Sequence, residues 1–312
     1  MIPKRPALPS PPGLELASLP KQKARQRGHL ESLLRDRSEA AARLGLLDRQ
    51  IERLAIESIC GLNDLQQVEQ YDGTLGVTRA LVDHVQGAVG QLQWLGTLAA
   101  MFTGPGDSPG NVAGVRWGSG GLISNNTYIT AGHCLDSYDE EWKTPKRADR
   151  SLPPSELAPL MQVVFNYQIN GTTGVLQTGE NFPVLELLEH RSGGLDYTLL
   201  RLGKNSAGRL PGEVYGVLTV AAHDLTDAGA MLCLIQHPDG QPKQIEAGPM
   251  KENVGGRISY ASLDTLNGSS GAPILSDAGE VVGVHTSGGC TRFNGENFGV
   301  AIGAIRAASV LL

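Results

Sequence analysis

Apolar residues in the first third of the chain recur at the alternating three-and-four spacing that is typical of an amphipathic helix. One such seam comprises Leu30, Leu33, Arg37, Ala40, Leu44, Leu47, Ile51 and Leu54. A second seam comprises Val77, Leu81, Val85, Ala88, Leu92 and Leu95, and continues towards Phe102. Turn-forming residues separate the two seams. We therefore expect an antiparallel helical hairpin within residues 21–105, which either packs on the protein or on a second copy, or serves as a regulatory or partner-docking module.

The helical period ends at residues 104–110, which read Gly-Pro-Gly-Asp-Ser-Pro-Gly. Short runs of β-type residues follow, and glycine, proline, asparagine and aspartate separate them. These runs span residues 121–129, 162–169, 182–188, 197–202, 231–235 and 280–285. They predict an all-β sandwich or barrel over residues 106–312, with a closing helix at 301–312.

The first 20 residues contain six prolines and little periodicity, so we expect a flexible leader. The four basic residues that follow are Lys21, Lys23, Arg25 and Arg27. A solvated tail explains them better than an acidic partner does. The leader lacks the apolar core of a secretory signal, which favours a cytoplasmic location.

Composition narrows the class of protein. Of the 312 residues, 40% are apolar and 19% are charged, which is enough apolar material for a core and excludes wholesale disorder. A net charge of −6 argues against nucleic-acid binding, and no apolar run is long enough to cross a membrane. The cysteines Cys60, Cys134, Cys233 and Cys290 form no CxxC pair, so we expect reduced thiols in the cytoplasm.

Three short sequences in the β-rich half carry candidate catalytic residues. His133 lies in Thr-Ala-Gly-His-Cys, Asp196 precedes the apolar run Tyr-Thr-Leu-Leu, and Ser270 lies in Asn-Gly-Ser-Ser-Gly-Ala-Pro. A serine hydroxyl needs a base to take its proton, and a histidine held in one tautomer by a carboxylate is suited to that task. The N–H groups of Gly268 and Ser270 are the natural donors to a developing oxyanion. A structural histidine, a turn aspartate and an ordinary Gly/Ser loop are the alternatives.

In their order His, Asp, Ser, these motifs resemble those of chymotrypsin-like (trypsin-fold) serine proteases. The three motifs follow one another at gaps of 63 and 74 residues, which strengthens this resemblance. The stretches 236–243 and 264–268 look closest to the bacterial branch that contains glutamyl endopeptidases. The resemblance covers residues 112–312 and implies a double β-barrel. It also implies that Ser270 is the nucleophile, His133 the general base, Asp196 the orienting acid and Gly268 part of the oxyanion hole.

The same resemblance leaves the specificity pocket open between two readings. Asp264 matches the position that selects lysine or arginine in trypsin, whereas Thr265 and His285 match residues that bind an acidic side chain in glutamyl endopeptidases. We favour acidic residues on the acyl side of the scissile bond (P1) over basic ones. Thr286, Ser287 and Gly288, together with His285, are expected to pair with the substrate main chain.

The sequence therefore predicts a serine endopeptidase that acts on a protein or peptide through an acyl-enzyme. No second ligand pair has zinc-like spacing, so neither a metal nor an organic cofactor is expected. The alternatives are a catalytically inactive protease fold used for binding and an esterase on the same scaffold. Residues 21–105 are expected to control access to the site or to dock a regulatory protein, without nucleic-acid or membrane binding.

Overall fold

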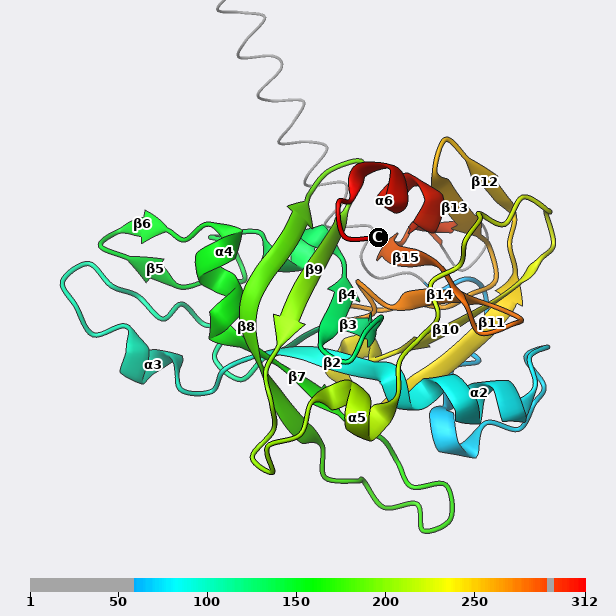
Figure 1. Cartoon of the computed structure of the whole chain (residues 1–312), viewed down its shortest axis with the longest axis horizontal. Coiled ribbons are helices and arrows are strands. Elements are labelled where there is room, and N and C mark those ends of the chain that lie inside the picture. The colour runs from blue at the N-terminus through cyan, green and yellow to red at the C-terminus, as the bar shows by residue number, and fades with distance from the viewer. Residues whose placement is uncertain (1–58, 291–294) are drawn as a thin grey trace, which may run out of the picture. The chain divides into compact units, whose positions relative to one another are not determined.

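A closed barrel of six antiparallel strands forms the first half of the fold in the computed structural model, which describes residues 59–290 and 295–312 (Figure 1). The strands follow the order β2-β3-β4-β9-β8-β7 around the barrel. Their bounds are Val89–Trp94 (β2), Arg116–Leu122 (β3), Thr127–Thr130 (β4), Met161–Phe165 (β7), Glu180–Arg191 (β8) and Tyr197–Leu202 (β9).

The second half is an antiparallel sheet with the strand order β1-β11-β10-β14-β15-β16-β13-β12. The bounds are Gln66–Gln67 (β1), Met231–Gln236 (β10), Gln244–Pro249 (β11), Glu252–Val254 (β12), Arg257–Tyr260 (β13), Pro273–Ser276 (β14), Val281–Ser287 (β15) and Asn297–Ala301 (β16). A barrel and a second curled sheet confirm the predicted chymotrypsin-like fold class. The shorter pair β5 (Lys146–Arg147) and β6 (Arg150–Ser151) lies outside both sheets.

The helical elements are short. They are α2 (Arg79–Val85), α3 (Leu98–Met101), α4 (Pro154–Leu157), α5 (Pro211–Tyr215), α6 (Ile302–Ala308) and the 3-10 turns η1 (Val68–Gln70), η2 (Gln86–Ala88), η3 (Gly132–Leu135), η4 (Ala158–Leu160) and η5 (Pro238–Gly240). The predicted closing helix is confirmed by α6. No helix of the described residues is long and apolar enough to cross a membrane.

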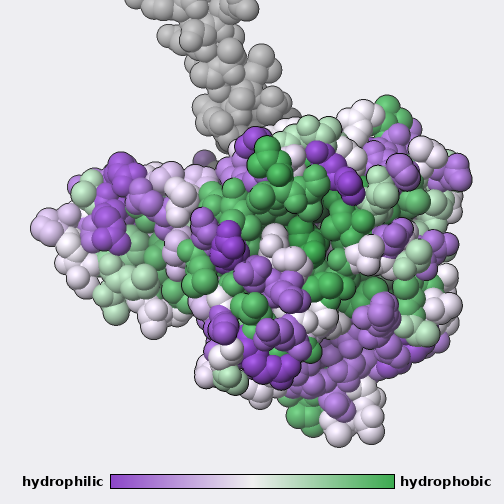
Figure 2. All heavy atoms as spheres, viewed as in Figure 1, coloured by the Kyte–Doolittle hydropathy of each residue, from purple (hydrophilic) through white to green (hydrophobic). Residues whose placement is uncertain are grey.

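Apolar side chains of the strands are packed in the core of the fold. In β4 and β9, Tyr128, Ile129, Leu199 and Leu200 are all fully buried, and backbone pairing joins the two strands from Thr127 to Thr130. On the face drawn in Figure 2, hydrophobic residues gather near the middle, where Figure 1 places β4, β14 and β15. The apolar side chains of β4 and β14 lie beneath this surface, since Ile129, Ile274 and Leu275 are fully buried.

A strand interrupts the second predicted helix. The elements α2, η2 and α3 are helical, but Val89–Trp94 between them is the barrel strand β2, paired with both β3 and β7. A short apolar run that is buried on both faces shows neither helical nor strand periodicity clearly. Here the run is a strand because β3 and β7 provide hydrogen-bond partners for its backbone. The barrel thus includes residues before 106, so the predicted boundary is wrong as well. The first predicted helix and the leader lie outside the described residues.

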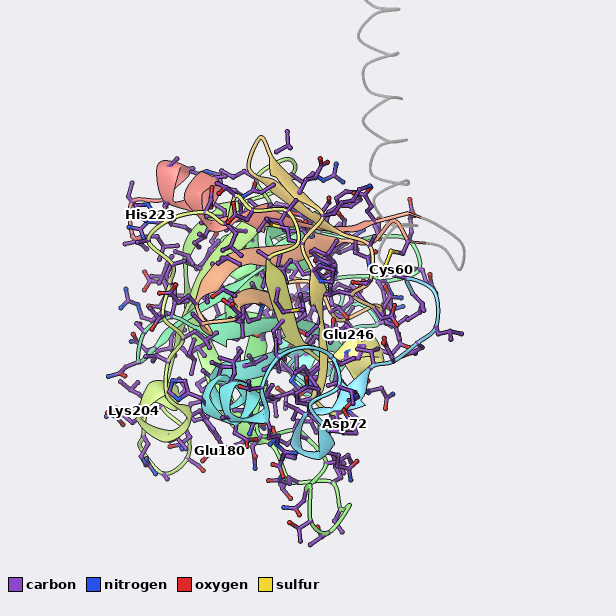
Figure 3. All side chains as sticks on the ribbon, turned by 90° about the vertical axis from the view of Figure 1, so that its right-hand side faces the viewer. Cys60, Asp72, Glu180, Lys204, His223 and Glu246 are labelled. Carbon is purple, nitrogen blue, oxygen red and sulfur yellow. A yellow bond between two sulfur atoms is a disulfide. The ribbon has the colours of Figure 1, made fainter. Side chains whose placement is uncertain are left out.

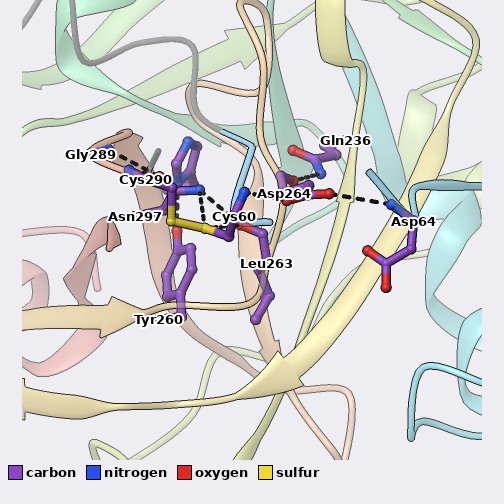
Figure 4. The surroundings of a disulfide bond; sticks show 10 residues. Cys60, Asp64, Gln236, Tyr260, Leu263, Asp264, Gly289, Cys290 and Asn297 are labelled. Atoms are coloured by element: carbon purple, nitrogen blue, oxygen red, sulfur yellow. Dashed lines mark hydrogen bonds between the residues drawn. A yellow bond between two sulfur atoms is a disulfide. The ribbon is translucent and has the colours of Figure 1, made fainter. Parts of the chain in front are cut away.

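A disulfide joins Cys60, ahead of β1, to Cys290, in the connection between β15 and β16 (Figures 3 and 4). The two residues are 230 apart in sequence, so no spacing signal could have revealed the pair. The expectation of four reduced cysteines is therefore wrong for these two, while Cys134 and Cys233 are free and buried. Since disulfides persist in oxidising surroundings, the cysteine argument for a cytoplasmic location no longer applies, and that location stays a prediction.

Candidate active site

His133 is held at the end of β4 by a turn that only glycine can make. The strand leads through Ala131 into η3, and a side chain at Gly132 would overlap the Arg191 carbonyl oxygen and the Asp196 carboxylate. The next residue, His133, therefore lies directly against the start of β9. The hydroxyl of Tyr138 donates to the His133 carbonyl at 2.8 Å and fixes the turn from the other side.

Asp196 engages His133 through both carboxylate oxygens. Oδ2 lies 2.6 Å from Nδ1 of the imidazole, and Oδ1 accepts the His133 backbone N–H at 2.7 Å. A carboxylate in this position stabilises the tautomer with the proton on Nδ1, which leaves Nε2 as the basic nitrogen. Asp196 is 9% exposed, so water does little to weaken the contact. The sequence motifs predicted this pairing, and the structure brings the two side chains together.

Ser270 lies in a tight loop between β13 and β14 that packs on β3. Its carbonyl accepts the Ser119 N–H at 2.9 Å and lies 3.9 Å from Cys134 Sγ, next to His133. Gly271, with φ +89°, leaves no room for a side chain between Thr130 and Ser119. The loop is therefore packed against the same turn that carries His133, and Ser270 is 5% exposed.

The loop presents two backbone donors on one side. The Asn267 carbonyl accepts the Asp239 N–H, and in a trans peptide this directs the Gly268 N–H the opposite way. Within the described residues, the Gly268 and Ser270 N–H groups donate to no acceptor, whereas those of Ser269 and Gly271 do. Such a pair of unengaged donors is what an oxyanion hole requires.

Two residues that the sequence analysis missed hold this loop in shape. Ser119 on β3 donates its hydroxyl to the Gly268 carbonyl at 2.7 Å and accepts the His237 N–H at 2.9 Å. Asp239 adopts a left-handed backbone (φ 51°), which turns its N–H towards Asn267. Neither residue carries a local signal, because each acts on a segment far away in sequence.

The pocket residues do not act as simple charges. Asp264 is fully buried, and its carboxylate accepts the N–H groups of Cys60 at 2.6 Å and Asp64 at 3.3 Å (Figure 4). Burial raises its pKa. His285 is 1% exposed and contacts the Tyr260 hydroxyl through Nδ1. Burial, followed by the neighbouring His133, lowers the pKa of His285 to about 3, so the ring is neutral at pH 7.

Unlike Asp264 and His285, Thr265 and the end of β15 have hydrogen-bonding groups that a substrate could contact. Thr265 is fully buried, yet its hydroxyl has no hydrogen-bond partner within the described residues. Strand β14 pairs with β15 only as far as Val284, so Thr286 and Ser287 lie partly exposed on an open edge. Gly288 follows directly and is buried.

Buried neutral histidines predict an acid-sensitive fold. Burial, followed by the charge of Lys243, lowers the pKa of fully buried His237 to about 3, against about 6.5 in the unfolded chain. The unfolded state therefore binds more protons below pH 6.5, and stability from this group is lost as the pH falls from about 6.5 towards 3. Between pH 7 and pH 5 the loss is about 2 kcal/mol. Urea unfolding at both pH values should show a smaller loss in His237→Gln, and equal losses in variant and parent would contradict the assignment.

The candidate catalytic residues of this site lie within a segment that is similar to known proteins. The family model for the trypsin-like peptidase domain matches residues 118–284, more than half of the chain. An uncharacterized protein, y4fB, of Sinorhizobium fredii is 30% identical over 189 residues, which are 55% of this chain and 25% of that protein. Glutamyl endopeptidase of Staphylococcus aureus (strain MRSA252) is 26% identical over 130 residues, 38% of this chain and 35% of that protein.

The chain thus spans only about a quarter to a third of these two relatives. Among solved structures, a serine endoprotease from Yersinia pestis superposes with a TM-score of 0.46 at 16% identity, over 73% of this chain and 63% of that one. The fold assignment rests on the strand topology and the family match.

Proposed function

Since this chain belongs to the trypsin-like peptidase family, we propose that it is a serine endopeptidase that works through Ser270, His133 and Asp196. The observation that carries the proposal is the paired contact of Asp196 with the ring and the backbone of His133, beside the Ser270 loop. This contact leaves a basic nitrogen on the imidazole and fixes its orientation. Such a group can take the proton of a serine hydroxyl, as acyl transfer from a peptide bond to serine requires.

In the proposed reaction, Ser270 Oγ attacks the carbonyl carbon of the scissile peptide bond while Nε2 of His133 takes the hydroxyl proton. The Gly268 and Ser270 N–H groups stabilise the negative charge that develops on the carbonyl oxygen. The imidazolium then gives its proton to the leaving amine, which leaves an ester on Ser270. Water, deprotonated by His133, hydrolyses that ester and restores the serine.

The open edge of β15 supports a substrate that binds as an additional strand. Main-chain groups of Thr286, Ser287 and Gly288 continue the strand past the end of β14, close to the Ser270 loop. A peptide in extended conformation would pair with these groups and extend the sheet. This arrangement favours unfolded or loop segments of proteins over small esters.

For the residue on the acyl side of the scissile bond (P1), we propose a preference for an acidic side chain. Asp264 is fully buried, and its carboxylate accepts two backbone N–H groups from the segment of Cys60 and Asp64, which favours a role in holding that segment over contact with a lysine or arginine. The buried, unpartnered hydroxyl of Thr265 can donate to a carboxylate. Because His285 is neutral, hydrogen bonds rather than a buried positive charge would provide the selectivity.

Cleavage of a peptide library tests both the activity and this preference. We expect cuts after glutamate and aspartate, and none in Ser270→Ala. In Thr265→Val, which keeps the side-chain shape but removes the hydroxyl, kcat/KM for acidic substrates should fall about tenfold, the cost of one hydrogen bond to a charged group. Cuts confined to lysine and arginine would contradict the preference while leaving the catalytic assignment intact.

The regulatory role that the sequence analysis gave to residues 21–105 is proposed for a shorter segment. Because β1 pairs with β11 and β2 belongs to the barrel, the residues from β1 onward cannot form a separate module. The apolar seam from Leu30 to Leu54 supports a docking helix for a partner protein. Deleting residues 1–53 and comparing activity, oligomeric state and partner binding with those of the full chain tests this role.

A further inference from the structure

Three carboxylates from distant segments of the chain meet in one cluster. Asp64 precedes β1, Glu246 lies on β11, and Asp264 follows β13. One oxygen from each lies within 4.8 Å of the other two. Figure 4 draws Asp64 and Asp264 beside the Cys60–Cys290 disulfide, and Figure 3 labels Glu246 on the same side of the molecule as Cys60.

Nothing basic balances this cluster. Within the described residues, no lysine, arginine or histidine forms an ion pair with Asp64, Glu246 or Asp264. Asp264 receives the two backbone N–H groups described above, which are dipoles and not charges. Like charges at this separation repel strongly where water is excluded, and either a bound cation or a proton on one of the carboxyl groups relieves this repulsion.

Glu246 supplies the second, independent sign of a ligand. Its side chain is fully buried, and Oε1 accepts the Ala247 N–H at 2.9 Å. The other oxygen, Oε2, is buried without any hydrogen-bond partner in the described part of the chain. A buried carboxylate oxygen without a donor costs free energy that a metal ion would offset.

We propose that Asp64, Glu246 and Asp264 bind one Ca²⁺ ion. Carboxylate oxygens are the ligands that hard cations prefer, and two oxygens bound to one Ca²⁺ stand at most about 4.8 Å apart, twice the Ca–O distance. Asp64 is exposed, which gives the ion a path from solvent and room for water ligands. The ion would fasten the segment that carries Cys60 and Asp64 to the second sheet, next to the disulfide.

Binding can be measured without any catalytic activity, so this inference stands or falls separately from the proposed function. Full-length Ser270→Ala protein, treated with EDTA and dialysed, is titrated with CaCl₂ in a calorimeter. We expect one Ca²⁺ per chain and a higher melting temperature in its presence. Asp64→Asn and Glu246→Gln should each raise the Kd about tenfold or more, since each removes one charged ligand.

Asp277→Asn is the matched control, because Asp277 is an exposed carboxylate on the β14–β15 turn, and its Kd should equal that of the parent. Absence of binding heat, or equal Kd values in parent and Asp64→Asn, would overturn the proposal. If Glu246→Gln does not fold, Asp64→Asn alone decides, because its exposed side chain can change without disturbing the core. Binding of Mg²⁺ but not of Ca²⁺ would contradict the choice of ion.

Discussion

Replacing Ser270 with alanine is expected to lower kcat for peptide hydrolysis by about 10⁶. The loss is this large because the hydroxyl oxygen forms the covalent bond of the acyl-enzyme, and no neighbouring group can replace it. KM should change little, since the edge of β15 and the pocket around Thr265 remain intact. Steady-state hydrolysis of a peptide cleaved by the parent protein measures the effect, and circular dichroism confirms that the fold is kept.

Ser206→Ala is the control for this change. Ser206 is an exposed serine in the turn after β9, far in sequence from the catalytic loop, and its removal should leave kcat unchanged. Parental activity in a clean Ser270→Ala preparation would end the assignment of the nucleophile. No activity in the parent either would instead favour a catalytically inactive protease fold used for binding.

The second large effect is expected for Asp196→Asn, which should reduce kcat at neutral pH by about 10⁴. The carboxylate now accepts from both Nδ1 and the backbone N–H of His133. An amide places its NH₂ group against one of these donors or turns the imidazole into the other tautomer. Nε2 would then carry the proton and could no longer act as the base. Single-turnover measurements, in which product release does not limit the rate, report this step directly.

Asp136→Asn tests whether any carboxylate near the turn would have the same effect. Asp136 lies three residues after His133, and its carboxylate is 3.6 Å from His190. Because its carboxylate is partly exposed and lies against His190, its neutralisation should change kcat by less than about threefold, as expected for a partly exposed pair. Equal losses in the two variants would point to a general electrostatic effect and contradict the orienting role of Asp196.

Sequence alone could predict those parts of the site that have local signatures. Gly132 and Gly271 are required by close backbone approaches, so the motifs around His133 and Ser270 keep a recognisable form. The strand pattern after residue 110 is likewise local, since alternating burial leaves its mark on consecutive residues. These features predicted the β architecture and the pairing of His133 with Asp196.

What sequence could not predict depends on neighbours that are distant along the chain. Val89–Trp94 is a strand because β3 and β7 flank it, although its apolar spacing also fits a helix. Cys60 pairs with Cys290 across 230 residues, and Ser119 holds the Gly268 carbonyl from another sheet. In each case the deciding contact joins segments that lie far apart along the chain.

The charge states of the specificity-pocket residues could not be predicted from the sequence either. Asp264 and His285 were identified as pocket candidates by position, but their positions did not reveal how deeply each side chain is buried. Burial keeps the His285 ring neutral, and the Asp264 carboxylate accepts a hydrogen bond from the Cys60 backbone N–H. The sequence favoured an acidic P1 residue because two matching positions outweighed one, and the buried side chains now base that proposal on hydrogen-bonding groups instead.

The most direct measurement treats the intact protein with a fluorophosphonate, which reacts only with an activated serine, and locates the adduct by mass spectrometry. The proposed mechanism predicts one adduct, on the peptide that contains Ser270, and none in His133→Ala. An adduct on another serine, or equal labelling of Ser270 when His133 has been removed, would contradict the claim that this histidine activates this hydroxyl.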